Sequence, residues 1–102
     1  MEQLTLNIPT NNKGKIQNLI NIFGSNDLFV DNFLEYHINR LKREIARMQF
    51  ALNKYETKYN LTSELFYKKI EAGELGDDKD FVMWSGIYEL LSESKKQLSQ
   101  LA

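Results

Sequence analysis

The stretch LEYHINRLKREIARMQFALNKYETKY, residues 34–59, decides most of the fold. Its apolar residues recur at alternating intervals of four and three: Leu34, Ile38, Leu41, Ile45, Met48, Leu52, Tyr55 and Tyr59. A sustained seven-residue repeat of this kind marks a long helix that packs along one seam against another helix. We therefore predict a helix from about residue 27 to about residue 59. The repeat leaves open whether the second helix of the seam belongs to the same chain or to another.

Two further helices are expected on the C-terminal side of this stretch. Thr62 or Ser63 can cap a short helix, because a hydroxyl oxygen accepts a hydrogen bond from the first free backbone N–H groups. Asp77 or Asp78 can cap a final helix that continues to about Leu101. The C-terminal half is thus predicted to be a helical extension.

A shorter amphipathic pattern precedes the long helix. Residues 13–23 place one apolar face at helical spacing, made by Ile16, Leu19, Ile20 and Phe23. Gly24 is a natural stop for this helix, since glycine accepts the left-handed backbone conformation.

Residues 3–8 alternate polar and apolar side chains up to Pro9, a pattern that predicts a short strand with one buried face. Such a strand has no partner in its own chain, and both of its backbone edges would stay unpaired. Antiparallel pairing with the same strand of a second chain would satisfy it, so we expect a homodimer joined through the N-terminal strands. The outer face of this two-stranded ribbon would present Gln3, Thr5 and Asn7 twice.

The side chains on that outer face are of types that hydrogen-bond base edges, and a two-stranded ribbon fits the major groove of DNA. Gln3, Thr5 and Asn7 are therefore candidate base-reading residues. A strand that only caps a helical core, or pairs in a dimer without touching DNA, stays open as the alternative.

Composition excludes several classes of protein. The chain has 102 residues, 42% of them apolar, which suits one folded domain. It has no Cys, no apolar run near the length of a transmembrane helix and no leader pattern, so a cytoplasmic location without membrane contact is expected. The formal net charge is −1, with 13 basic and 14 acidic residues, which is unfavourable for a nucleic-acid binder.

No catalytic or cofactor motif stands out. A nucleophile–base pair, a phosphate loop and a glycine fingerprint are all missing, so we expect a protein that is not an enzyme and needs no cofactor. Asp77, Asp78 and Asp80 could hold a metal ion, but helix capping explains them better and no metal is expected. His37 is the only histidine and has no second ligand near it in the sequence.

The first 45 residues resemble the ribbon-helix-helix family of DNA-binding repressors. The resemblance is carried by Leu4-Thr5-Leu6-Asn7-Ile8-Pro9, the amphipathic helix that follows, and the turn Gly24-Ser25-Asn26. It implies that the amides of Ser25 and Asn26 at the start of the second helix grip a DNA phosphate, as helix N-termini can. We also place Lys13 and Lys15 as phosphate contacts.

The C-terminal half resembles the ending of the antitoxins of prokaryotic toxin–antitoxin pairs. Its distinctive residues are an acidic cluster beside aromatic side chains: Phe66, Asp77, Asp78, Asp80, Phe81 and Trp84. The resemblance implies that this region holds a protein partner, the cognate toxin. Aromatic anchors often supply much of the energy at such interfaces. The same residues could instead be helix caps and core, and this alternative stays open.

The sequence thus predicts a mainly α protein with one short N-terminal strand: a ribbon-helix-helix dimer with a long second helix and a helical extension. Residues 1–45 would form the dimerisation and DNA-binding unit, and residues 46–102 the partner-binding extension. The expected function is an autorepressing antitoxin that binds operator DNA and neutralises a toxin. The alternative is a helical adaptor that does not bind DNA and works through its coiled-coil surface.

Overall fold

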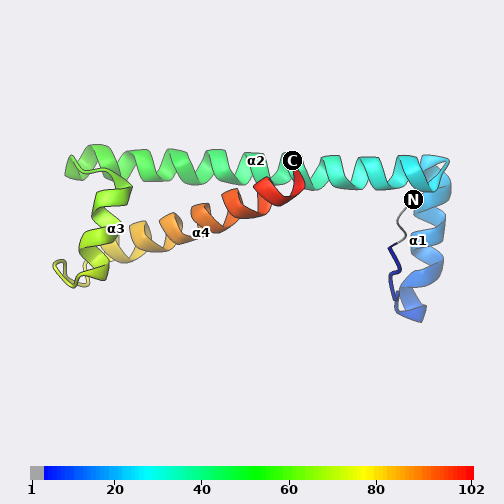
Figure 1. The fold of residues 1–102 in the computed structure, drawn as a ribbon, viewed down its shortest axis with the longest axis horizontal. Helices are drawn as coiled ribbons and strands as arrows, with labels where there is room; N and C mark the ends of the chain where they lie inside the picture. Colours follow the sequence, from blue (N-terminus) through cyan, green and yellow to red (C-terminus); the bar gives the residue numbers. More distant parts are fainter. Residues whose placement is uncertain (1–3) are drawn as a thin grey trace. The chain divides into compact units, whose positions relative to one another are not determined.

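The computed structural model describes residues 4–102, and all regular structure within them is helical (Figure 1). The elements are α1 Thr10–Phe23, α2 Asn26–Tyr59, α3 Ser63–Glu71 and α4 Lys79–Leu101. The chain divides into two compact units, Met1–Tyr36 and His37–Ala102, and α2 contributes to both. The boundary lies nine residues before the one expected from the sequence, which followed residue 45.

The turn between α1 and α2 follows from three residues. Gly24 adopts φ 95°, and its N–H donates to the carbonyls of Ile20 and Asn21, which closes α1. The Ser25 hydroxyl then accepts the N–H of Leu28 at 3.1 Å, so it caps the start of α2. The sequence therefore specifies both the stop and the restart.

The predicted N-terminal strand is wrong for the residues that the structure describes. Residues 4–9 have no regular secondary structure, and no strand occurs between residues 4 and 102. Leu4 and Leu6 are 86% and 70% exposed instead of buried. A strand forms only when a second extended segment shares its hydrogen bonds, and the described chain offers none. The ribbon-helix-helix fold is therefore replaced by an all-helical one.

The unit His37–Ala102 has a continuous core. The chain turns through α3, and α4 then runs back beside the second half of α2 (Figure 1). Leu52 from α2, Phe66 from α3, and Trp84 and Leu91 from α4 are each at most 4% exposed. The heptad seam from residue 45 onward packs within the chain, through Ile45, Met48, Leu52, Tyr55 and Tyr59.

The unit Met1–Tyr36 has no such core. None of residues 4–36 is buried, and four of them are half-buried: Ile16, Ile20, Phe23 and Phe29. These four lie on the facing sides of α1 and the start of α2, where the rings of Phe23 and Phe29 meet edge to face at 6.0 Å. The helices of this unit are joined by few side chains, and much of their apolar surface stays open.

Candidate functional site

An aromatic cluster fills the inside of the unit His37–Ala102. The indole of Trp84 stacks on Phe66 with ring centroids 3.7 Å apart, and Tyr55 and Tyr59 each stack on it at 5.7 Å. The indole N–H donates to the hydroxyl of Ser63 at 2.8 Å. This bond gives an acceptor to the one polar side-chain atom that Trp84 carries into the core. An unpaired buried donor would cost stability, so the bond matters to the fold.

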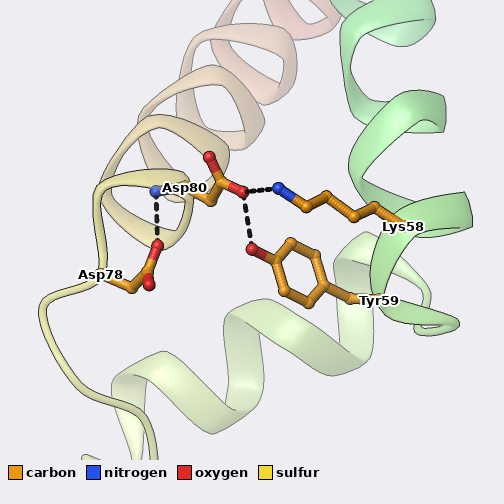
Figure 2. Close-up of polar contacts among 4 residues, drawn as sticks. All are labelled: Lys58, Tyr59, Asp78 and Asp80. Atoms are coloured by element: carbon orange, nitrogen blue, oxygen red, sulfur yellow. Dashed lines mark hydrogen bonds and ion pairs between the residues drawn. The ribbon is translucent and has the colours of Figure 1, made fainter.

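A polar cluster closes one end of this core, where α4 begins beside the end of α2 (Figure 2). One carboxylate oxygen of Asp80 accepts from the ammonium of Lys58 and from the hydroxyl of Tyr59, each at 2.6 Å. The side chain of Asp78 accepts the backbone N–H of Asp80 at 2.9 Å and so caps α4. Both aspartate side chains therefore accept hydrogen bonds from groups of the same chain.

The cluster shifts the pKa values of its members. The hydrogen bond from Lys58, then that from Tyr59, lowers the pKa of Asp80 below its ordinary 3.8. The same bonds to Asp80 raise the pKa of Lys58 above 10.5 and that of Tyr59 above 10.0. Each shift favours the protonation state that makes the bond. The cluster thus acts as a charged clasp between α2 and α4.

A second link joins α3 to α4. The hydroxyl of Tyr67 donates to the carboxylate of Glu89, and the rings of Tyr67 and Tyr88 lie 4.9 Å apart. The hydrogen bond to Glu89, followed by burial, raises the pKa of Tyr67 to about 12. In each of the two links a tyrosine hydroxyl donates to a carboxylate, and each link joins two helices of the unit.

The residues predicted to bind a protein partner lie mostly inside this unit or at its helix start. Phe66 and Trp84 are fully buried, and Phe81 is half-buried against Phe66 and Tyr59. Asp78 and Asp80 have the internal partners described above. Asp77 and Asp78 are both exposed, and Asp77 has no capping or clasp role among the described contacts. Their assignment to a partner stays a prediction, and the structure gives five of them a place in the fold.

Of the residues predicted to bind DNA, Asn7 and Lys13 line one hollow together with Leu6 and Ile8. Gln3 lies outside the described residues. Thr5 and Asn7 are exposed in the irregular segment before α1, and Lys13 and Lys15 are exposed on α1. Their DNA contacts stay predictions.

The residues expected to hold a DNA phosphate lie at the start of α2. Ser25 uses its hydroxyl to cap α2, and Asn26 is the first residue of that helix. The DNA contact expected there also stays a prediction.

An apolar groove in the unit Met1–Tyr36 was not anticipated as a site. It has a volume of about 330 Å³ and is lined by Leu19, Phe23, Phe29, Asn32, Phe33 and Tyr36. The sequence carries its signal, because residues 19, 23, 29 and 33 fall on the apolar stripes of two consecutive helices. What the stripes could not show is that the unit leaves this surface uncovered.

Residues 4–102 contain no group of three His, Cys, Asp or Glu side chains placed to hold a metal ion. Within the same residues, no helix is both long enough and apolar enough to cross a membrane. The expected cytoplasmic location stays a prediction.

No protein-family model, curated protein or solved structure matches this chain.

Proposed function

We propose that this chain is a non-catalytic helical interaction protein that associates with a second copy of itself through the unit Met1–Tyr36. One observation carries the proposal: none of residues 4–36 is buried within the chain. Exposed apolar patches of this extent usually mark an association surface, since leaving them in water forfeits the burial that stabilises a fold. The unit His37–Ala102 has its own core and needs no such help.

The uncovered surface is centred on the aromatic groove. Leu19 is 40% exposed at its edge, and Phe33 is 53% exposed on the neighbouring helix. A helix face with such a stripe gains most by packing against another apolar helix face. Small units of this length rarely bury enough apolar surface alone, and oligomerisation is a common remedy.

Charge favours a second copy as the occupant. The unit carries Lys13 and Lys15 near the start of α1, and Asp27, Asp31 and Glu35 in the first part of α2. None of these five forms an ion pair with any of residues 4–102. In a two-fold interface each patch meets its complement twice. A surface with separate basic and acidic ends is therefore self-complementary.

The repressor and antitoxin roles stay predictions beside this proposal. Beside the buried Trp84, α4 also carries exposed apolar side chains that a second protein could contact. Val82, Met83 and Leu90 are exposed there, between 50% and 61%.

Replacing Leu19 by Glu tests the proposal. We expect the unaltered chain to sediment as a dimer that dissociates on dilution, and Leu19→Glu to weaken dimerisation at least about tenfold, or about 1.4 kcal/mol. Sedimentation equilibrium over a range of concentrations measures this. Ile22→Glu is the matched control, because Ile22 is on the same helix, is 78% exposed and does not line the groove.

Fluorescence of Trp84, the only tryptophan, reports in both variants whether the unit His37–Ala102 stays folded. A chain that is monomeric at every concentration, or equal weakening by the two substitutions, would contradict the proposal.

A further inference from the structure

The outer face of α2 carries a basic stripe, which we define as Arg40, Arg43, Arg47, Lys54 and Lys58. Successive members are three, four, seven and four residues apart, so they fall on one side of the helix. Arg43 and Ile45 of the core seam point about 200° apart, because each residue turns an α-helix by about 100°. Arg43, Arg47 and Lys54 thus lie on the side of α2 away from the face that packs into the core, and Lys58 lies at the edge of the stripe beside α4.

The middle of the stripe has no internal counter-charge. Arg40 pairs with Glu44 at 3.1 Å, and Lys58 pairs with Asp80 at 2.6 Å. In contrast, Arg43, Arg47 and Lys54 form no ion pair with any residue between 4 and 102. All three are exposed.

The two carboxylates on the same helical stretch have partners other than Arg43, Arg47 and Lys54. Between residues 37 and 59 the acidic side chains are Glu44 and Glu56. Glu56 accepts the backbone N–H of Ser63 at 2.8 Å, on the side of α2 that faces α3. Glu44 is the partner of Arg40. A run of like charges at helical spacing destabilises a helix slightly, so its presence on an otherwise well-packed helix needs a reason outside the fold.

An exposed aromatic ring sits within the stripe. Phe50 is 63% exposed, and the ammonium of Lys54 lies 4.8 Å from its ring centroid. Water solvates a phenyl ring poorly, and a ring between cations can contact a sugar, a base edge or the methyl group of thymine. The stripe therefore combines positive charge with one apolar contact point.

We propose that the basic stripe of α2 binds the phosphates of double-stranded DNA. The guanidinium groups of Arg43 and Arg47 suit phosphate oxygens, which they can bind in a bidentate manner. A helix face is a ridge, and the major groove of DNA admits a helix between two rows of phosphates. The stripe extends over about 27 Å at about 1.5 Å per residue, long enough to follow several phosphates.

Other anionic partners fit the stripe less well. A membrane-bound helix inserts its apolar face among lipids, but the apolar face of α2 is packed within the unit His37–Ala102. An acidic protein lacks the regular dense charge of duplex DNA, about one phosphate per 1.7 Å of axis. The proposal is separate from self-association, because the stripe lies wholly within one unit.

The test uses the full chain and a fluorescein-labelled DNA duplex of arbitrary sequence, with anisotropy measured over a series of salt concentrations. Binding in the range of non-specific affinities, about 10⁻⁴ to 10⁻⁶ M near physiological salt and tighter below it, is expected. The double variant Arg43→Gln/Arg47→Gln should bind at least about tenfold more weakly at low salt. It should also flatten the slope of log K against log salt by about 2, since each lost phosphate contact removes about 1.

The matched control is Lys95→Gln/Lys96→Gln, which removes the same charge from exposed positions on α4. Its affinity and salt slope should stay close to those of the unaltered chain. Equal losses in the two double variants would show an effect of net charge alone and overturn the proposal. So would the absence of duplex binding at low salt, or tight binding of poly-L-glutamate in place of the duplex, which would assign the stripe to an acidic protein.

Discussion

The two units of this chain use similar helices to different ends. In His37–Ala102, α2, α3 and α4 meet around Trp84, and apolar side chains from all three are buried. In Met1–Tyr36, α1 and the start of α2 carry equally apolar stripes, yet nothing among residues 4–36 is buried. Apolar content does not separate the units. The difference is that three helices can enclose a residue and two short ones cannot.

The two units thus differ in what their apolar side chains can do: those of His37–Ala102 stabilise the chain, and those of Met1–Tyr36 stay available to another molecule. A side chain buried within its own chain contributes to folding and is unavailable for binding. Phe66 and Trp84 are buried in this way, and their assignment to a protein partner stays a prediction. The surfaces that we propose for partners are the groove around Leu19 and the basic stripe of α2.

The largest effect that tests this comparison is expected from Phe66→Ala. The ring is fully buried and stacks on Trp84, so its removal should lower the free energy of unfolding of the unit by about 3–5 kcal/mol. Urea unfolding followed by Trp84 fluorescence and by circular dichroism measures the loss.

Phe23→Ala is the matched change in the other unit. It should alter the Trp84 transition by less than about 0.5 kcal/mol, because Phe23 belongs to the other unit and substitutions at sites without shared partners act independently. A similar loss from both substitutions would show that the units fold as one.

A smaller loss of stability is expected when the Ser63 hydroxyl, the hydrogen-bond acceptor inside the core, is removed. Ser63→Ala leaves the Trp84 indole N–H without its acceptor at 2.8 Å, so the unit should lose about 1–3 kcal/mol of stability. The loss should appear as a lower urea midpoint with an unchanged slope.

The double variant Ser63→Ala/Trp84→Phe supplies the control for that interpretation. Once the N–H is gone, Ser63→Ala should cost clearly less in the Trp84→Phe background than alone. Circular dichroism follows this series, since it does not depend on the indole. Equal costs in the two backgrounds would mean that Ser63 acts through its N-terminal position in α3 and not through the indole.

The helices were predictable because their signals are local. The heptad spacing, Gly24, Thr62 and Asp78 each specify a stretch or an end of helix from neighbouring residues, and α3 and α4 begin after the expected caps. The strand was not, because strand formation depends on a partner that the alternation of residues 3–8 cannot supply. The alternating pattern indicates only that one face of the segment is apolar, and it does not show which segment would pair with it.

The candidate sites were only partly predictable, for a similar reason. The acidic and aromatic residues near Trp84 were visible in sequence, but their burial depends on how α3 returns the chain to α2. The basic stripe was hidden by the net charge of −1. It emerges when positions are placed around the helix, since Arg43, Arg47 and Lys54 then share one side of α2 and Glu56 falls on another.

The smallest expected effect concerns the clasp at Asp80, and it depends on pH. Because the folded state lowers the pKa of Asp80, the stabilisation that Asp80 provides is present above about pH 4 and is lost as the pH falls through the lowered value. The raised pKa values of Lys58 and Tyr59 act at high pH: the stabilisation that they provide is present below about pH 10 and is lost as the pH rises through the raised pKa values.

Asp80→Asn should therefore lower the thermal midpoint between these pH limits and leave it nearly unchanged in strong acid. Glu64→Gln breaks a looser pair with Lys68, 3.6 Å long and exposed on both sides, and should show a smaller gap at neutral pH. If the gap between Asp80→Asn and the unaltered chain persisted in strong acid, the aspartate would stabilise α4 as an uncharged side chain, and the clasp would not be electrostatic.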